Sequence, residues 1–168
     1  MTVEEFRASE RLPLVVVLDN VRSKNNIGSI FRTGDAMGIK EIFLCGITAT
    51  PPDREIHKTA LGAEESVPFR YEADIDVALD SLRSAGYCIY AVELAHNSLK
   101  LGRDSIDTER PIALVFGNEI EGVQESVIER CDGCLEIPQY GSKHSLNVSC
   151  AAAIAMWEIR KEFGIVKS

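Results

Sequence analysis

The feature that most constrains the fold is a short Val-rich run, "LPLVVVLDN", at residues 12–20. Such a run is typical of a strand buried on both faces of a parallel sheet. Similar runs predict five further strands, at 41–46, 67–72, 87–94, 111–119 and 134–138. Helical spacing and cap signals predict helices between them, at 26–38, 74–85, 124–130 and 146–163. Because strands alternate with helices, we expect an α/β fold with a mostly parallel sheet flanked by helices.

The length of 168 residues favours a single domain. Residues 1–11 form a short extension before the first strand, and residues 47–66 are expected to be a loop with one helical turn. No apolar run reaches the roughly 18 residues that span a bilayer, and the charged start does not resemble a secretory signal. Five cysteines at irregular positions fit free thiols in a reducing compartment, so we expect a cytoplasmic protein.

The net charge of −8 argues against a protein that coats nucleic acid in general, because such binding neutralises phosphates. It leaves room for a local basic patch on an acidic body. The candidates for that patch are Arg22, Lys24, Arg32, Arg54, His57, Lys58, Lys143 and His144. Cys131 and Cys134 form a lone C-x-x-C without a second ligand pair, so we expect no metal site.

Three loops follow predicted strands, where ligands bind in open α/β sheets. In the first, "DNVRSKNNIGSIFR" (19–32), Asn25 or Asn26 could cap the next helix, and Arg32 lies beyond its first turn. In the second, "LVFGNEIEGV" (114–123), Glu119 and Glu121 follow a glycine. These acids could form an acid–base pair or simply start a helix. No dinucleotide or P-loop glycine motif is present.

The third loop, "IPQYGSKHSLN" (137–147), leads into an Ala-rich helix. Ser142 or Ser145 could cap that helix, and Asn147 could be a second cap. Lys143 and His144 could be a solvated loop tip, and His144 could also act as a general base. A helix cap needs only one of these polar side chains, so the presence of the others requires a further explanation.

Together the three loops resemble the SpoU (TrmH-type) RNA ribose 2′-O-methyltransferases of the SPOUT superfamily. The motif N-x-G-x-x-x-R matches Asn26, Gly28 and Arg32, and G-N-E-x-x-G matches the stretch 117–122. The third motif, I-P-x-x-G followed by S-L-N-V-S, matches 137–141 and 145–149. All three occur in order, and the resemblance spans about residues 12–163. The small departures include Gly34 and Cys150, and no separate RNA-binding domain is expected before the first strand.

The resemblance implies a single SPOUT domain over residues 1–168, with a C-terminal trefoil knot that general folding rules would not suggest. It implies S-adenosylmethionine as the cofactor, transfer of its methyl group to a ribose 2′-hydroxyl, and transfer or ribosomal RNA as the substrate. The absence of a phosphate-binding glycine loop agrees, since this cofactor carries no phosphate. The implied cofactor-binding residues are Leu94, Gly117, Ile137, Pro138 and Leu146.

The resemblance also implies a catalytic set of Arg32, Asn26, Glu119, Ser145 and Asn147. In that reading, Asn26 and Glu119 orient Arg32 and the ribose, and Ser145 and Asn147 hold the pocket. RNA-phosphate contacts are expected from Arg22, Lys24, Lys143 and His144.

Homodimers are implied as well. The Ala-rich face of the last helix, with Met156 and Trp157, is either the dimer contact or part of an internal core. Two other functions stay open: a non-catalytic RNA-binding or assembly protein with this fold, and a small-molecule enzyme that uses Glu119 and Glu121.

Overall fold

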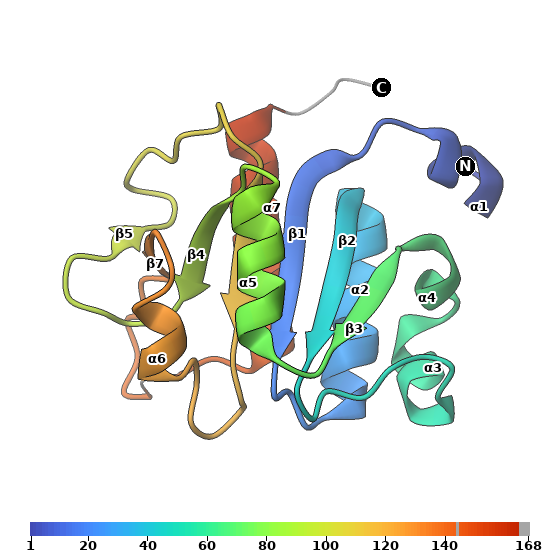
Figure 1. The fold of residues 1–168 in the computed structure, drawn as a ribbon, viewed down its shortest axis with the longest axis horizontal. Helices are drawn as coiled ribbons and strands as arrows, with labels where there is room; N and C mark the ends of the chain where they lie inside the picture. Colours follow the sequence, from blue (N-terminus) through green and yellow to red (C-terminus); the bar gives the residue numbers. More distant parts are fainter. Residues whose placement is uncertain (144, 165–168) are drawn as a thin grey trace.

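The structure, a computed structural model, describes residues 1–143 and 145–164 (Figure 1). Within those residues a seven-stranded sheet has the order β3-β2-β1-β6-β4-β7-β5, and every pairing between its strands is parallel. The strands are β1 Leu12–Asp19, β2 Ile39–Cys45, β3 Phe69–Glu72, β4 Cys88–Val92, β5 Leu99–Lys100, β6 Ile112–Phe116 and β7 Gly133–Glu136. The helices are α1 Val3–Ala8, α2 Lys24–Met37, α3 Arg54–Ala60, α4 Ala63–Ser66, α5 Ile75–Ser84, α6 Glu125–Ile128 and α7 Val148–Phe163.

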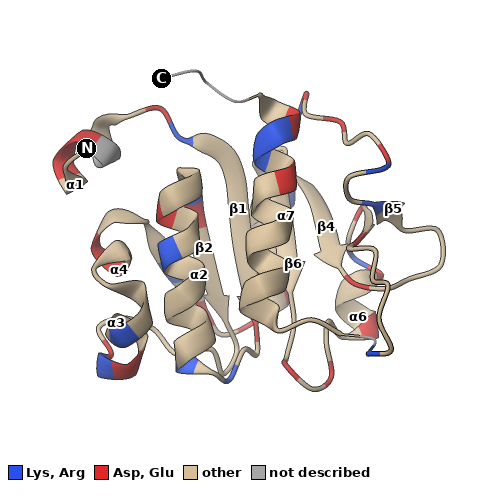
Figure 2. Ribbon diagram, turned by 180° about the vertical axis from the view of Figure 1, so that it is seen from behind, with Lys and Arg blue, Asp and Glu red and all other residues tan. Residues whose placement is uncertain are grey.

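Helices cover both faces of the sheet. Figure 1 shows α5 in front of the strands, and Figure 2 shows α2 and α7 side by side on the opposite face. The side chains of β1 alternate between the two hydrophobic cores: Leu14, Val16 and Leu18 face α2 and α7, whereas Val15 and Val17 face α5. All five are buried. The predicted α/β class and doubly buried first strand are therefore confirmed, whereas the trefoil knot remains a prediction.

The main errors of the sequence analysis concern short helices and caps. Residues 47–66 contain two helices, α3 and α4, and residues 1–11 contain α1. The two-residue strand β5 was not expected. Ser23 rather than Asn25 or Asn26 caps α2. Asn147, which the sequence offered as a second cap beside Ser142 and Ser145, caps α7. Asp74, the first residue of the predicted helix 74–85, caps α5 by accepting a hydrogen bond from the Asp76 N–H.

Gly28 allows α2 and α3 to approach closely. A Cβ atom at this position would lie 2.0 Å from Thr59 Oγ1 and 2.3 Å from the Ile56 carbonyl oxygen. Thr59 Oγ1 also donates a hydrogen bond to the Asn25 carbonyl, at 2.9 Å. The glycine of the first motif is thus explained by helix packing, and this packing fixes the first turn of α2 relative to α3.

None of the helices in the described part of the chain combines the length and apolar character that crossing a membrane requires.

Candidate active site

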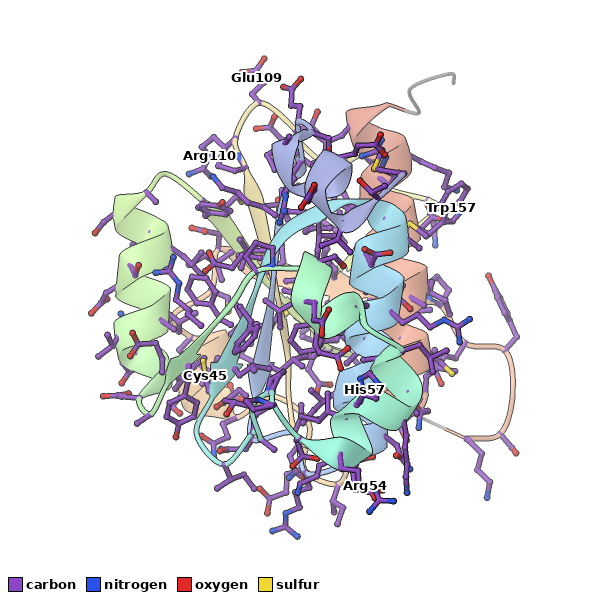
Figure 3. All side chains as sticks on the ribbon, turned by 90° about the vertical axis from the view of Figure 1, so that its right-hand side faces the viewer. Cys45, Arg54, His57, Glu109, Arg110 and Trp157 are labelled. Atoms are coloured by element: carbon purple, nitrogen blue, oxygen red, sulfur yellow. The ribbon has the colours of Figure 1, made fainter. Side chains whose placement is uncertain are left out.

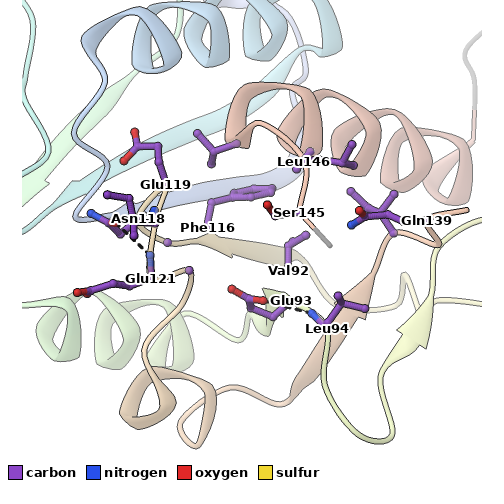
Figure 4. A pocket seen from close by; sticks show the side chains of 16 residues that line it. Val92, Glu93, Leu94, Phe116, Asn118, Glu119, Glu121, Gln139, Ser145 and Leu146 are labelled. Carbon is purple, nitrogen blue, oxygen red and sulfur yellow. Dashed lines mark hydrogen bonds between the residues drawn. The ribbon is translucent and has the colours of Figure 1, made fainter. Parts of the chain in front are cut away.

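A cavity of about 250 Å³ opens at the edge of the sheet where the parallel strands end. Its walls come from the segments that follow β4, β6 and β7 and from the start of α7, and Figure 4 shows their side chains converging. Two of the three loops that the sequence analysis singled out, 114–123 and 137–147, therefore meet here with the segment that follows β4. The lining includes apolar side chains, polar side chains and backbone from Val92, Glu93, Leu94, Phe116, Gly117, Asn118, Glu119, Ile120, Glu121, Gly122, Ile137, Gln139, Ser145, Leu146, Val148 and Ala151.

The second motif folds into a tight loop that forms one wall. Asn118 and Gly122 exchange two backbone hydrogen bonds of 3.1 and 2.8 Å, and Asn118 Oδ1 accepts from the N–H groups of Ile120 and Glu121. Only glycine fits at 117, because a Cβ there would lie 2.1 Å from the Gly122 carbonyl oxygen. Gly122 itself has a φ of +69°, which glycine adopts without strain. The two motif glycines are therefore requirements of this turn.

Glu119 connects this loop to the start of α2. Its carboxylate accepts hydrogen bonds from the backbone N–H groups of Arg22 and Ser23, at 3.0 and 2.9 Å. Burial acts to raise the pKa of Glu119, but these hydrogen bonds outweigh it and hold the pKa below its ordinary value. The expected contact with Arg32 is absent among the described residues. Glu119 therefore positions, as an ionised carboxylate, the backbone just before α2.

Asn147 joins α7 to α2. Its Oδ1 accepts from the N–H groups of Ser149 and Cys150, which caps α7. Its Nδ2 donates to Asn26 Oδ1 across 3.3 Å. Two predicted catalytic residues from distant motifs are thus in contact, and the cap and the site share one side chain.

Arg32 lies outside the cavity. It is exposed on α2, and no hydrogen bond or ion pair connects its side chain to any residue in the ranges 1–143 and 145–164. Its guanidinium group is therefore available to a ligand or to a second copy of the chain.

The other predicted residues divide clearly between lining and rim. Six line the cavity: Leu94, Gly117, Glu119, Ile137, Ser145 and Leu146. Pro138 is half-buried beside it, whereas Arg22 and Lys143 are exposed. Lys24 forms an ion pair of 2.8 Å with Asp53, whose hydrogen bond raises the pKa of Lys24. His144 lies outside the described residues.

The sequence analysis missed Glu93. Its Oε1 accepts from the Val123 N–H at 2.8 Å, and a Cβ on Gly122 would come within 2.0 Å of that oxygen. Glu93 thus holds the Val123 end of this loop, and Glu119 connects the other end to the backbone just before α2. The available signal was an acidic residue directly after the apolar run of β4, at the edge where parallel strands end.

The charged side chains that line the cavity restrict the class of ligand. Its described lining contains the carboxylates of Glu93, Glu119 and Glu121 but no lysine, arginine or histidine. A ligand rich in phosphate would meet repulsion here. A ligand with an apolar ring and a positive charge fits, and S-adenosylmethionine has both features.

Comparison with known proteins identifies the protein family. The profile of the SpoU rRNA Methylase family matches residues 13–157. The chain belongs to this family.

Similar proteins agree with that membership. A tRNA (guanosine(18)-2′-O)-methyltransferase of Thermus thermophilus is 33% identical over 162 residues, covering 95% of this chain and 80% of the relative. A crystal structure of the A. aeolicus TrmH/SpoU tRNA modifying enzyme has a TM-score of 0.83 at 28% identity, covering 95% and 81%. An AdoMet-bound rRNA methyltransferase from Sinorhizobium meliloti has a TM-score of 0.80 at 30% identity, covering 93% and 59%.

Proposed function

We propose that this SpoU-family protein transfers the methyl group of S-adenosylmethionine to a ribose 2′-hydroxyl of transfer or ribosomal RNA. The observation that carries the proposal is the cavity itself, where two of the three motifs form acidic and apolar walls at the strand ends. The relatives, which are named as tRNA and rRNA methyltransferases, support the substrate class.

The cofactor-binding role falls to the apolar and backbone groups of the cavity. Leu94, Ile137 and Leu146 offer surfaces for an adenine ring, Gly117 offers close approach to the backbone, and Pro138 stiffens the wall beside them. When bound here, S-adenosylmethionine would supply an electrophilic methyl group on its positively charged sulfur. The protein's part is then to hold an acceptor hydroxyl in line, a positioning effect worth up to roughly 7–11 kcal/mol in well-oriented cases.

Arg32 is assigned to the acceptor side. A guanidinium stays charged at physiological pH, so it cannot act as a base in the ordinary sense. It instead binds the neighbouring phosphate through bidentate hydrogen bonds and stabilises the negative charge that develops on the 2′-oxygen. Asn26, Ser145 and Asn147 orient the ribose, and Glu119 fixes the turn that carries Asn26.

A homodimer would place Arg32 of one protomer at the cavity of the other protomer. Arg32 is exposed and lies outside the cavity of its own protomer. The surface of α7 supports this proposal: Ile154 and Trp157 are 40% and 44% exposed on one side of the helix. Met156 and the alanines Ala152 and Ala155 point into the protomer core instead. Of the two alternatives for the last helix, the internal core therefore holds for Met156, and α7 has both a core face and an exposed apolar face.

Phosphate contacts are assigned to Arg22, Lys24, Lys143 and His144, on the grounds of charge and, for the first three, of exposure. A cytoplasmic location follows from this proposal, since its RNA substrates are found there.

The two other functions are less well supported. A small-molecule enzyme with Glu119 as a base would need a free carboxylate, but Glu119 is engaged by two backbone N–H groups. A non-catalytic binding protein is less favoured, because the relatives are named as methyltransferases.

The proposal is tested by ligand stabilisation and by RNA mapping. S-adenosylhomocysteine should raise the melting temperature, because a ligand that binds only the native state stabilises it. Total RNA from cells with the gene should contain a 2′-O-methyl group that is missing without it. If both RNA samples carry identical methyl groups and the melting temperature does not move, the function is wrong.

Arg32→Lys tests whether Arg32 acts through bidentate binding of the phosphate. We expect a loss of about 100-fold in kcat with little change in S-adenosylhomocysteine affinity, because lysine keeps the charge but loses the planar fork. Methyl transfer from labelled S-adenosylmethionine measures the rate, and calorimetry measures the affinity. Near-normal turnover by this variant would remove Arg32 from the reacting groups.

A further inference from the structure

Three of the apolar side chains that line the cavity are exposed to solvent. They are Leu94, Ile120 and Leu146, with exposed fractions of 51%, 84% and 40%. Single exposed apolar residues are ordinary on protein surfaces, but several around one cavity indicate a surface that a ligand covers. The proposed function assigns Leu94 and Leu146 to the adenine ring of the cofactor. Ile120 is the most exposed of the three, and the proposed function gives it no role.

Ile120 stands on a loop whose shape is fixed by hydrogen bonds. Its N–H donates to Asn118 Oδ1 at 2.9 Å, and the backbone of Asn118 is paired with that of Gly122. Asn118 Nδ2 donates to the Asn20 carbonyl at 3.0 Å, which connects the loop to the end of β1. None of these hydrogen bonds involves the Ile120 side chain. The loop therefore presents this side chain to solvent in a fixed place, which lowers the entropy cost of covering it.

Ile120 borders the cavity on the side where the acceptor ribose is proposed to bind. It directly follows Glu119, whose carboxylate binds the backbone just before α2. The first turn of α2 carries Asn26, which contacts Asn147 at the start of α7. Figure 4 shows Glu119 on the side of the cavity toward α2, across from Gln139. A nucleotide whose ribose reaches Asn26 therefore brings its base to this side of the opening.

The size of the cavity places that base outside it. The cavity volume of about 250 Å³ lies below the roughly 300–1,000 Å³ that is usual for the site of one ligand. The cavity therefore cannot enclose both the cofactor and an acceptor nucleotide. When the cofactor occupies it, the base of the acceptor nucleotide remains at the opening, where Ile120 is exposed.

The chemistry of this wall favours an uncharged ring over a phosphate or a protein. The described lining contains no lysine, arginine or histidine, and the acidic Glu121 follows Ile120 directly, so a phosphate would be repelled here. A stable protein interface covers about 800 Å² on each partner, which is far more than one side chain offers. Every nucleobase has a flat apolar face, and such a face packs well on an aliphatic side chain.

We propose that Ile120 packs against the base of the nucleotide that becomes methylated and thereby holds the ribose of that nucleotide at the cavity. This proposal rests on the proposed RNA methyl transfer. An aliphatic side chain forms no hydrogen bond with the edge of a base, so the contact suits all four bases. It requires a base whose face is not stacked on a neighbour, as in the single-stranded loops, bulges and ends of RNA. The proposal therefore narrows the substrate to an unstacked nucleotide.

Ile120→Ala tests the contact in the reaction, with RNA from cells lacking the gene as substrate. The variant should lower kcat/KM for RNA about tenfold, the size of one lost base contact, and should keep the wild-type affinity for S-adenosylhomocysteine. Ile120→Leu retains the apolar surface and should restore most of the rate. Ile47→Ala is the matched control, because Ile47 is 62% exposed on the loop after β2 but does not line the cavity. Wild-type kcat/KM in Ile120→Ala, or an equal loss in Ile47→Ala, would overturn the proposal.

A direct test of the contact does not depend on methyl transfer. The methyl signals of the isoleucines can be followed by NMR, and the signal of Ile120 is the one that is missing in Ile120→Ala. Short single-stranded RNA of mixed sequence, added with S-adenosylhomocysteine present, should move the Ile120 signal through the ring current of a base and leave the Ile47 signal in place. If the Ile120 signal stays where it is, no base packs on this side chain and the proposal is wrong. A signal that moves with RNA that the wild type never methylates would support the contact and contradict the proposed reaction.

A second copy of the chain is the alternative occupant. The proposed dimer contact contains Trp157, which Figure 3 shows on the outer side of α7, whereas Ile120 belongs to the loop after β6. Light scattering after gel filtration should therefore give Ile120→Ala the same apparent mass as the wild type. Its melting temperature should also be unchanged, because the side chain is 84% exposed. A fall in the apparent mass would mean that a partner subunit rather than a base covers Ile120, which would refute the proposal.

Discussion

At the scale of single residues, two carboxylates fix the loop between the cofactor cavity and α2. Glu119 holds the near end through Arg22 and Ser23, and Glu93 holds the far end through Val123. A charged acceptor of two backbone N–H groups is stronger than a neutral one. The loop 117–123 is therefore positioned at both ends before any ligand binds.

The depressed pKa of Glu119 makes its contribution depend on pH. Because the folded pKa lies below the unfolded value of 4.5, this stabilisation is complete above about pH 4.5 and is lost as the pH falls through the folded pKa. Glu119→Gln should therefore be less stable than the wild type at pH 7, and the gap should narrow as the pH falls below 4.5. Urea unfolding at a series of pH values measures it. A gap that is constant with pH would mean that the charge of Glu119 does not matter.

Glu93 should contribute to the affinity for the cofactor, because it holds one end of the loop 117–123. Glu93→Ala leaves the Val123 N–H without its acceptor, so we expect S-adenosylhomocysteine to bind about tenfold more weakly, which corresponds to about 1.4 kcal/mol. Glu93→Gln keeps an acceptor and should lose less. Calorimetry measures both, and Glu109→Gln, outside the cavity lining, is the control. Wild-type affinity in Glu93→Ala would leave the loop anchored by Glu119 alone.

At the scale of elements, contact between helices explains motif residues that resemble site residues. Gly28 touches no part of the cavity and serves the packing of α2 on α3. Asn147 ends one helix and contacts another. Motifs in this family therefore combine residues that build the scaffold with residues proposed to meet the substrate.

Gly28→Ala tests the packing role. The new methyl group would collide with the Ile56 carbonyl, which is backbone and cannot turn away, so we expect a loss of about 1–3 kcal/mol in stability. Gly62→Ala is a useful contrast: no atom lies near its Cβ position, but its φ of +93° makes any loss a matter of backbone strain instead. Chemical denaturation gives both values. If Gly28→Ala retained wild-type stability, α2 and α3 would have room to separate without cost.

At the scale of the whole molecule, the described residues combine the cavity at the strand ends with an exposed apolar face on α7. Figure 2 shows α7 bearing its basic residues near its C-terminal end, which leaves the rest of its outer side uncharged except for an acidic position. The proposed dimer would cover Ile154 and Trp157 there.

Ile154→Glu tests that dimer. Ile154 is 40% exposed, so the change should leave the fold intact while the apparent mass falls from that of a dimer to that of a protomer. Val77→Glu on α5, at 49% exposure on the opposite face, should leave the mass unchanged. Light scattering after gel filtration measures both. A wild-type protein that is already a monomer would rule out the dimer and would leave Arg32 to act within one chain.

The sequence alone determined the α/β class, the strands from β1 to β7 except β5, and the cavity residues of the second and third motifs. It could do so because buried strands and motif glycines leave local patterns that need no knowledge of distant contacts. The helices α3 and α4 were missed because each is too short for a periodic pattern to show.

Only the tertiary structure decided which polar residue does what. Asn147 caps α7, Ser23 caps α2 and Glu119 binds α2 backbone, although several neighbours of each were equally suitable by residue type. The hydrogen bond of Glu93 could not be inferred from the sequence, because its partner Val123 lies 30 residues away. Hydrogen bonds between segments distant in sequence depend on how the sheet and helices pack, and no local pattern records them.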